Sequence, residues 1–154
     1  MNGEIQRHGS VIVVPHPEDE TKPFSERRYL IIRRSERVAA PGKLCFPGGG
    51  IESGETPEQA ARREFREEVG GEITDLCPIW ENVTPWCVHL RWFSGKLTSP
   101  ITALTPAPAE VSSILWLNIE SLLDAPDTLA SNTPFLTGLL NGTIVLPQSK
   151  KTEG

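Results

Sequence analysis

The strongest structural signals of this chain lie between Gly48 and Gly71, in the segment GGGIESGETPEQAARREFREEVGG. It joins three consecutive glycines to the clearest helix signal in the sequence. Thr56 is a favourable N-cap, Pro57 suits the first helical position, and Gln59 stands three residues past the cap, as in a capping box. Gly70 accepts the left-handed geometry that closes a last helical turn. The stretch therefore predicts a glycine-rich loop followed by a helix that ends at Gly70.

The predicted helix, from about Pro57 to about Val69, has two unlike faces. Apolar residues recur every four positions and mark a buried stripe: Ala61, Phe65 and Val69. Acidic residues stand at positions i, i+3 and i+4, a spacing that brings side chains onto one helix face: Glu64, Glu67 and Glu68. The spacing predicts three carboxylates that converge near the C-terminal end of the helix.

This crowding of carboxylates is unfavourable without a counter-charge. Repulsion between the anions and with the negative end of the helix dipole costs roughly 1–3 kcal/mol in total. Arg62, Arg63 and Arg66 can offset only part of that cost. A bound Mg²⁺ or Mn²⁺ would explain the arrangement, because hard cations prefer carboxylate and carbonyl oxygens and often bind substrate phosphates. Gly48 and Gly49 would let backbone groups approach the ion or a pyrophosphate closely.

Residues Gly49 to Gly71 resemble the signature box of the Nudix hydrolase family, G-x5-E-x7-R-E-U-x-E-E-x-G-U, in which U is a bulky apolar residue. The matching positions are Gly49, Glu55, Arg63, Glu64, Phe65, Glu67, Glu68 and Gly70. Gly71 is the one departure, since the pattern expects an aliphatic residue there, and it concerns only the packing at the helix exit. Eight matched positions are far more specific than a short glycine motif.

The resemblance implies roles for the residues of the box. Glu64, Glu67 and Glu68 are implied to bind Mg²⁺ or Mn²⁺ and to serve catalysis, with a backbone carbonyl of Gly48 or Gly49 as a further ligand. Two other residues are implied to brace the loop and the helix: Glu55 and Arg63. The implied reaction is the attack of a metal-activated water on one phosphorus of a pyrophosphate.

The resemblance also implies the architecture and the kind of substrate. We expect an α/β/α sandwich around a mixed β-sheet, formed by one domain over residues 6–142, with a last short strand and a polar tail over 143–154. The substrate would be a small nucleoside diphosphate derivative such as ADP-ribose, a sugar nucleotide, coenzyme A or a nucleoside triphosphate. Which of these it is, and whether the chain forms a homodimer, stays open at this point.

Elements outside the box follow from the spacing of apolar residues. Short β-branched runs predict strands over 11–14, 29–32, 44–46, 73–80, 88–93, 113–117 and 144–146. Helical spacing predicts two further helices over 119–123 and 134–140. Loops over 15–28, 81–87 and 99–109 connect the strands, and long loops in compact domains are often functional. The sequence shows no internal repeat and no second domain.

Composition narrows the classes of function. The length of 154 residues suits one domain, and the net charge of −5 disfavours binding to nucleic acid. No segment approaches the ~20 apolar residues of a membrane span, and the N-terminus lacks the pattern of a secretory signal, so we expect a cytoplasmic protein without membrane contact. The cysteines form no C-x-x-C pair, which argues against a disulfide framework and a structural zinc site: Cys45, Cys77 and Cys87.

A few residues outside the box are further candidates for the site. Some members of the family place the general base in a distant loop, which makes Glu110, directly after the Pro-rich loop 99–109, the catalytic candidate here. Arg33 and Arg34 end a predicted strand and could bind substrate phosphate, although a surface role suits them equally. One tryptophan could stack on a base, although core packing is the commoner role: Trp80, Trp86 or Trp92.

Two other functions compete with a general nucleotide pyrophosphatase. Arg33-Arg34-Ser35 and Glu110-Val111 loosely resemble the coenzyme A pyrophosphatase branch, but Val38 stands where that branch expects an arginine, with Arg37 one place off. A Nudix-fold module that binds nucleotides without hydrolysis is the alternative from another class. Such modules typically lack acidic residues of the box, whereas this chain keeps all of them.

Overall fold

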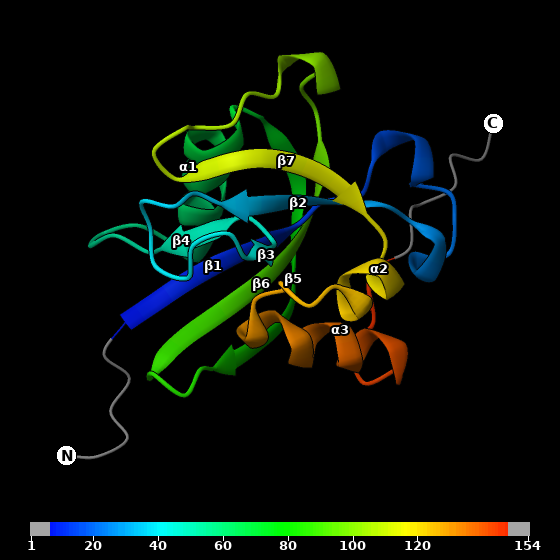
Figure 1. Ribbon diagram of the computed structural model, residues 1–154. Coiled ribbons are helices and arrows are strands. Elements are labelled where there is room, and N and C mark those ends of the chain that lie inside the picture. Colours follow the sequence, from blue (N-terminus) through cyan, green and yellow to red (C-terminus); the bar gives the residue numbers. More distant parts are fainter. Residues whose placement is uncertain (1–6, 148–154) are drawn as a thin grey trace.

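Two β-sheets form the middle layer of the fold, which the computed structural model describes for residues 7–147 (Figure 1). The strands are β1 (Arg7–Val13), β2 (Tyr29–Arg34), β3 (Leu44–Cys45), β4 (Gly48–Gly50), β5 (Ile73–Val83), β6 (Val88–Leu97) and β7 (Val111–Leu117). The helices are α1 (Pro57–Val69), α2 (Ile119–Asp124) and α3 (Thr133–Leu140). Short 3₁₀ turns lie at Pro17–Asp19, Phe24–Glu26, Ile101–Ala103 and Ala130–Asn132.

The larger sheet is mixed, as expected. Its strand order is β4-β1-β6-β5, and β1 is parallel to β6 but antiparallel to β4. The smaller sheet has the order β3-β2-β7 and is antiparallel. The amide of Leu30 donates to the carbonyl of Val14 at 2.9 Å, so the two sheets are joined where β1 passes toward β2.

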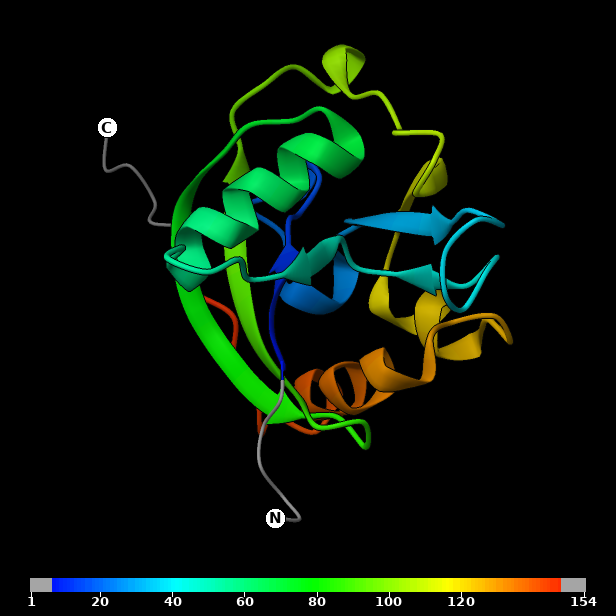
Figure 2. The ribbon, with the colours of Figure 1, turned by 90° about the vertical axis from the view of Figure 1, so that its left-hand side faces the viewer.

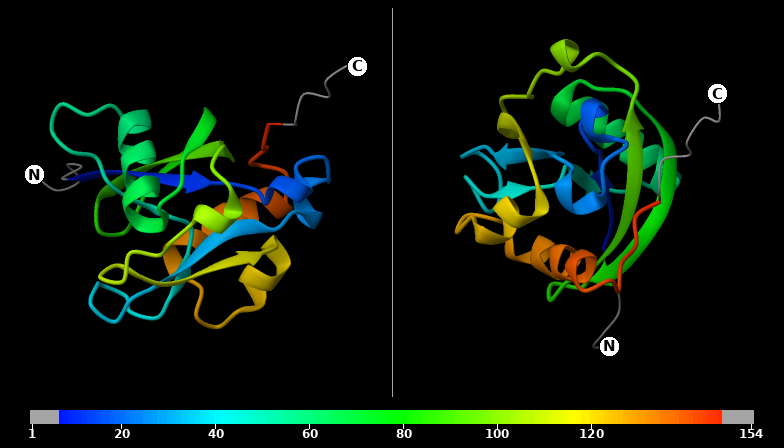
Figure 3. Two further views of the ribbon diagram at one scale, coloured as in Figure 1. Left: turned by 90° about the horizontal axis from the view of Figure 1, so that it is seen from above. Right: turned by 90° about the vertical axis from the view of Figure 1, so that its right-hand side faces the viewer.

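Helices cover both faces of the sheets, which confirms the α/β/α sandwich (Figures 2 and 3). On one side α1 packs its stripe of Ala61, Phe65 and Val69 against residues of β1, β2 and β6. On the other side α2 and α3 pack around Trp92, which stacks on Phe135 with ring centroids 4.4 Å apart. Within the described residues no helix is long and apolar enough to cross a membrane.

The predicted ends of α1 are confirmed. Thr56 Oγ1 accepts a hydrogen bond from the Gln59 amide at 3.1 Å, and Gln59 Oε1 accepts one from the Thr56 amide at 2.8 Å. Gly70 closes the helix with φ of +70°. The departure at Gly71 also has a physical reason, because a Cβ there would lie 2.6 Å from the Phe65 ring and 2.7 Å from Leu104. The side chains of those two residues fill the space that an aliphatic residue would occupy.

Two expectations from the sequence are wrong. Residues Gly48–Gly50 are not a loop but the strand β4, which pairs with β1 through the register Gly9↔Gly50, Ser10↔Gly49 and Val11↔Gly48. Residues 144–146 do not form a last strand. Ile144 and Leu146 instead bury their side chains in the core beside α3, and the Ile144 amide donates to the Gly138 carbonyl at 3.0 Å. The expected polar tail, 148–154, lies outside the described residues.

Asp19 anchors the connection between β1 and β2. Its buried carboxylate accepts hydrogen bonds from the amide of Arg28 at 2.8 Å and from the guanidinium at 2.9 and 3.1 Å, and Lys22 lies 3.1 Å away. The hydrogen bonds from Arg28 hold the pKa of Asp19 well below its ordinary value. Folding lowers the pKa of Asp19, so the ionised carboxylate stabilises the folded protein. This contribution is fully present above pH ~4, where Asp19 of the unfolded chain is also ionised, and is lost as pH falls further.

We expect Asp19→Asn to lower the free energy of unfolding by about 2 kcal/mol at pH 7, since hydrogen bonds to charged groups contribute about 1.5–3 kcal/mol. Urea titrations at pH 7 and pH 3 would measure the difference, which should shrink at the lower pH. Glu18→Gln is the matched control, because Glu18 is exposed and lies 3.5 Å from the same guanidinium. An equal loss at both pH values would contradict the role assigned to the Asp19 charge.

Candidate metal and phosphate site

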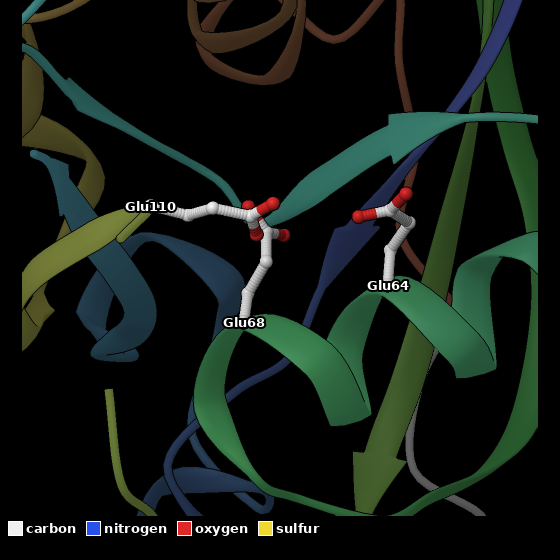
Figure 4. A group of neighbouring side chains, drawn as sticks. All are labelled: Glu64, Glu68 and Glu110. Carbon is white, nitrogen blue, oxygen red and sulfur yellow. The ribbon is translucent and has the colours of Figure 1, made fainter. Parts of the chain in front are cut away.

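Three carboxylates, two from α1 and one from the loop before β7, converge beside β4 (Figure 4). Glu64 and Glu68 project from successive turns of α1, and Glu110 reaches toward Glu68 from the residue before β7. One oxygen of each carboxylate lies within 4.8 Å of the others. The structure thus brings together two of the three predicted helix glutamates and the predicted loop glutamate.

Glu68 is the buried member of the group. Its residue surface is only 6% exposed, and its Oε1 accepts a hydrogen bond from the Gly48 amide at 2.8 Å. Burial raises the pKa of Glu68 to about 8, and the nearby charges of Glu64 and Glu110 act in the same direction. Burial likewise raises the pKa of Glu64. The raised pKa values show that the ionised carboxylates are unfavourable together at this site, so they favour protonation, and a bound cation would favour their ionised forms.

The Pro-rich loop holds Glu110 in place by hydrogen bonds to the end of α1. The amide of Thr105 donates to the carbonyl of Val69 at 2.8 Å, and the amide of Ala107 donates to the carbonyl of Glu68 at 2.9 Å. The last carbonyls of a helix have no partner inside it, so the loop satisfies them. These bonds tie the loop directly to the backbone of Glu68, which keeps Glu110 beside that residue.

The edge of β4 that faces away from β1 completes the site. In an antiparallel strand the backbone groups of alternate residues point to opposite edges. The amide of Gly48 and the carbonyl of Gly50 point away from β1, where they bind Glu68 and Arg63. The carbonyl of Gly48 faces the same edge, beside the carboxylates. Gly49 lies against the Glu64 carboxylate. A Cβ added to Gly49 would lie 2.5 Å from each oxygen of that carboxylate.

Arg63 joins the loop after β4 to the acidic face of α1. It donates to Glu55 at 2.7 and 3.0 Å, to the Gly50 carbonyl at 2.8 Å and to Glu64 at 2.9 Å. The hydrogen bonds from Arg63 hold the pKa of Glu55 at about 2. Glu67 also pairs with Arg63, at 3.1 Å, but its side chain is 52% exposed and it lies outside the group of three carboxylates.

We expect Arg63→Lys to weaken metal binding and to reduce turnover by about 10–100-fold, the usual loss when a partner that orients metal ligands is removed. A lysine keeps the charge but cannot form the forked contacts to Glu55, Gly50 and Glu64. Isothermal titration with Mn²⁺ would measure the affinity. Arg66→Lys is the control, since among residues 7–147 the Arg66 side chain forms an ion pair only with the exposed Glu72. Equal affinities in the two variants would argue against the bracing role.

The carboxylate group fits a divalent cation. Two ligands on opposite sides of Mg²⁺ are about 4 Å apart, so small side-chain rotations would bring Glu64, Glu68 and Glu110 onto one ion. All of the donors are oxygens, which suits Mg²⁺ or Mn²⁺ better than a soft metal. The glycines of β4 keep that edge clear of side chains, so the ion and a phosphate have room beside the backbone.

A pocket of about 700 Å³ opens over β4. Gly48, Gly49 and Arg34 line it, whereas Arg33 does not and instead contacts the Gly42 carbonyl at 2.8 Å and Asp127 at 2.5 Å. Arg34 donates through Nε to the Ala39 carbonyl at 2.7 Å. The structure thus brings only the second of the two predicted arginines to the pocket.

The pocket wall includes several residues that the sequence did not single out. Asn132 is 4% exposed, lines the pocket and accepts a hydrogen bond from the Phe46 amide at 3.0 Å. An asparagine before a helix is most simply explained as a cap, so the sequence contains no sign of this contact. Leu90 and Val88 line the pocket as well, and their alternation along β6 was the available signal.

Comparison with known proteins relates the chain to one family. The NUDIX domain model matches residues 6–137. The nucleoside triphosphatase NudI of Escherichia coli and that of Shigella flexneri are each 41% identical over 59 residues, a match that spans 38% of this chain and 38% of theirs. Among solved structures, a MutT Nudix hydrolase from Burkholderia pseudomallei has a TM-score of 0.62 at 18% identity, covering 86% of this chain and 97% of that one. A Caenorhabditis elegans Ap4A hydrolase has a TM-score of 0.65 at 18% identity, covering 88% and 97%.

Proposed function

Because the chain belongs to the Nudix hydrolase family, we propose that it is a divalent-metal-dependent hydrolase of the pyrophosphate bond in a nucleoside diphosphate derivative. One observation supports this most strongly: Glu64 and Glu68 of α1 meet Glu110 of the loop before β7, beside the side-chain-free edge of β4. An exposed acidic helix face would need neither the buried position of Glu68 nor the approach of Glu110 from the loop before β7. The pocket beside β4 would hold the rest of the substrate.

We assign the cation to Glu64, Glu68 and Glu110, with the Gly48 carbonyl as a further ligand. When bound, Mg²⁺ or Mn²⁺ supplies a Lewis acid that stabilises charge on the phosphoryl oxygens. Glu68 gives up its proton when it becomes a ligand, since only the carboxylate binds a hard cation well. Glu55 and Arg63 act indirectly, by keeping Glu64 and the loop after β4 in position.

The remaining residues position the reactants. Arg34 has its Nε bound to the Ala39 carbonyl, and we assign its terminal nitrogens to a phosphate oxygen in the pocket. Glu110 is the exposed member of the carboxylate group and faces solvent-accessible space. With one oxygen of Glu110 assigned to the cation, its second oxygen would accept a proton from a water molecule that attacks the phosphorus. The bond from that phosphorus to the bridging oxygen would break, and the other phosphate would leave with the bridging oxygen. Glu67 is assigned no direct role in that step, because it pairs with Arg63 outside the group.

The direct test is hydrolysis of a substrate panel with Mg²⁺ or Mn²⁺ and with chelator. The panel holds ADP-ribose, sugar nucleotides, coenzyme A, dinucleoside polyphosphates and nucleoside triphosphates, the last two being named for the relatives above. Chelator-sensitive release of a nucleoside monophosphate or of pyrophosphate from one class would support the proposal. Turnover that persists in chelator, or its absence throughout the panel, would contradict it.

The same panel tests the competing functions. Binding of nucleotides without turnover would favour a non-catalytic nucleotide-binding module. Preference for coenzyme A would favour the coenzyme A pyrophosphatase branch of the family. The contacts of Arg33 do not support that branch, because Arg33 pairs with Asp127 and does not line the pocket. The three carboxylates at the site favour hydrolysis over both a binding module and a purely structural acidic face.

A further inference from the structure

Trp86 stands out because its large apolar side chain is exposed beside the pocket. It lies in the turn between β5 and β6, is 71% exposed and lines the pocket over β4. Exposing an indole ring to water is unfavourable, so a ring of this size on a pocket wall points to a ligand that covers it. Nothing in the carboxylate site requires a tryptophan at this position.

The turn presents Trp86 in a defined position. The Thr84 amide donates to the Val88 carbonyl at 2.9 Å, and the Cys87 amide donates to the Thr84 carbonyl at 3.0 Å. The Val88 amide donates in return to Thr84 Oγ1 at 3.2 Å. Cys87 adopts φ of +61°, which closes the turn tightly. A ring on such a turn loses little conformational freedom when a ligand binds.

The pocket runs continuously from the phosphate side to Trp86. Gly50 pairs with Gly9 on β1, and Gly9 pairs with Leu90 on β6, so these three residues form one row across the sheet. Two strand spacings of ~4.8 Å put the ends of that row roughly 10 Å apart. From Leu90 the pocket wall continues along β6 through Val88 to Trp86, in the turn before that strand. A ligand with phosphates at β4 would therefore place its other end at the turn.

The chemistry of the wall suits an anion with a flat apolar group. Between the glycines and Trp86 the wall is mainly apolar, with contributions from Val11, Phe46, Leu90 and Ile51. Its charged side chains, Arg7 and Arg34, are both cations, and no carboxylate lines the pocket within residues 7–147. The pocket volume of about 700 Å³ suits one nucleoside with its phosphates rather than a larger ligand enclosed as a whole.

We propose that Trp86 is a substrate-binding residue that stacks on the base of a nucleotide whose phosphates lie at the edge of β4. The inference rests on the proposed function and narrows its substrate class to compounds with an accessible nucleobase. The other candidate tryptophans are excluded, because Trp92 is fully buried with its Nε1 bound to Asn82, and Trp80 packs against Trp92. Neither of them lines the pocket.

Binding of compounds without an anhydride bond tests the inference separately from turnover. Isothermal titration would compare AMP, GMP, CMP and UMP with ribose 5-phosphate, which lacks the base, in wild type, Trp86→Ala and Trp86→Phe. We expect Trp86→Ala to weaken binding of at least one nucleotide by about tenfold or more, as loss of base stacking does, and to leave ribose 5-phosphate unchanged. Trp86→Phe should retain binding within about threefold.

Val83→Ala is the matched control, since Val83 is exposed at 52% near the same turn but does not line the pocket. Circular dichroism and thermal melts would show that each variant is folded. Unchanged nucleotide binding in Trp86→Ala, or an equal loss of affinity for ribose 5-phosphate, would overturn the inference about Trp86 and leave the proposed function standing. Loss of a dimer in sedimentation with unchanged nucleotide binding would show instead that Trp86 contacts a second copy. Failure of the wild type to bind any of these compounds would count against the proposed function as well.

Discussion

Glu68→Gln is expected to reduce kcat by well over 100-fold, because it removes the buried carboxylate that we assign to the cation and beside which the other two carboxylates lie. Loss of a residue that only orients a ligand costs about 10–100-fold, so a loss of a ligand should exceed that range. Glutamine keeps the shape and can still accept the hydrogen bond that Gly48 donates at 2.8 Å. The folded structure should therefore survive. Steady-state assays at saturating Mg²⁺ would measure the loss.

The same variant should be at least as stable as the wild type when chelator is present. The folded pKa of Glu68 is about 8, above that of an unfolded glutamate, so folding favours the protonated form. That contribution is full below about pH 4 and is lost as pH rises through 8. The neutral glutamine side chain makes no pH-dependent contribution to stability. In chelator, the melting temperature of Glu68→Gln should therefore exceed that of the wild type by an amount that grows between pH 5 and pH 8.

Glu67→Gln is the control for both measurements. Its carboxylate is 52% exposed and lies outside the group of three, so the variant should lose at most 100-fold in kcat and should not gain stability with pH. Equal losses in the two variants would mean that the acidic face of α1 acts as a whole. The distinction assigned here between the buried glutamate and the exposed one would then be wrong.

The helix of the box could be predicted almost to the residue because its signals are local. Thr56, Gln59 and Gly70 act within one turn of the residues they cap, so adjacent sequence contains the information. The α/β/α class also followed, although from the family resemblance rather than from periodicity. Elements whose ends depend on neighbours along the chain are those that the sequence analysis placed best.

Features that depend on distant partners could not be read in the same way. Three glycines have low strand propensity, and Gly48–Gly50 form β4 only because β1, almost 40 residues earlier, pairs with them. Ile144 is apolar and β-branched, yet it has no strand to pair with and packs beside Gly138. The separation between Glu68 and Glu110 likewise gives no sign of their proximity, which arises from the loop bonded to the end of α1. In the sequence, only the family resemblance points to Glu110.

Alanine at each of the three glycines should have three different effects, because each position faces different atoms. At Gly48 a Cβ would collide with the carbonyl oxygen of Ser10 and lie 2.9 Å from the Cα of Val11. Backbone atoms in a paired strand cannot move aside easily, so Gly48→Ala should lower the free energy of unfolding by about 2–4 kcal/mol through strain and weakened pairing. Urea titration in chelator would measure this loss without any contribution from metal.

Gly49→Ala should instead impair catalysis while the protein stays folded. The added Cβ would meet the carboxylate of Glu64, and that flexible side chain can rotate away. Rotation would remove Glu64 from the group with Glu68 and Glu110, so we expect kcat to fall at least 10-fold and Mn²⁺ affinity to fall with it. The free energy of unfolding in chelator should change by less than about 1 kcal/mol, since no backbone contact is broken.

Gly50→Ala is the internal control of the series. The nearest atom to its added Cβ is the carbonyl oxygen of His8 at 3.9 Å, an ordinary contact, and the Gly50 carbonyl that binds Arg63 is unaffected. Activity and stability should both stay near wild-type values. If Gly49→Ala proved as active as Gly50→Ala, Glu64 could not be a ligand whose position β4 controls. If Gly48→Ala were as stable as Gly50→Ala, the close pairing of β4 with β1 would not be needed for the fold.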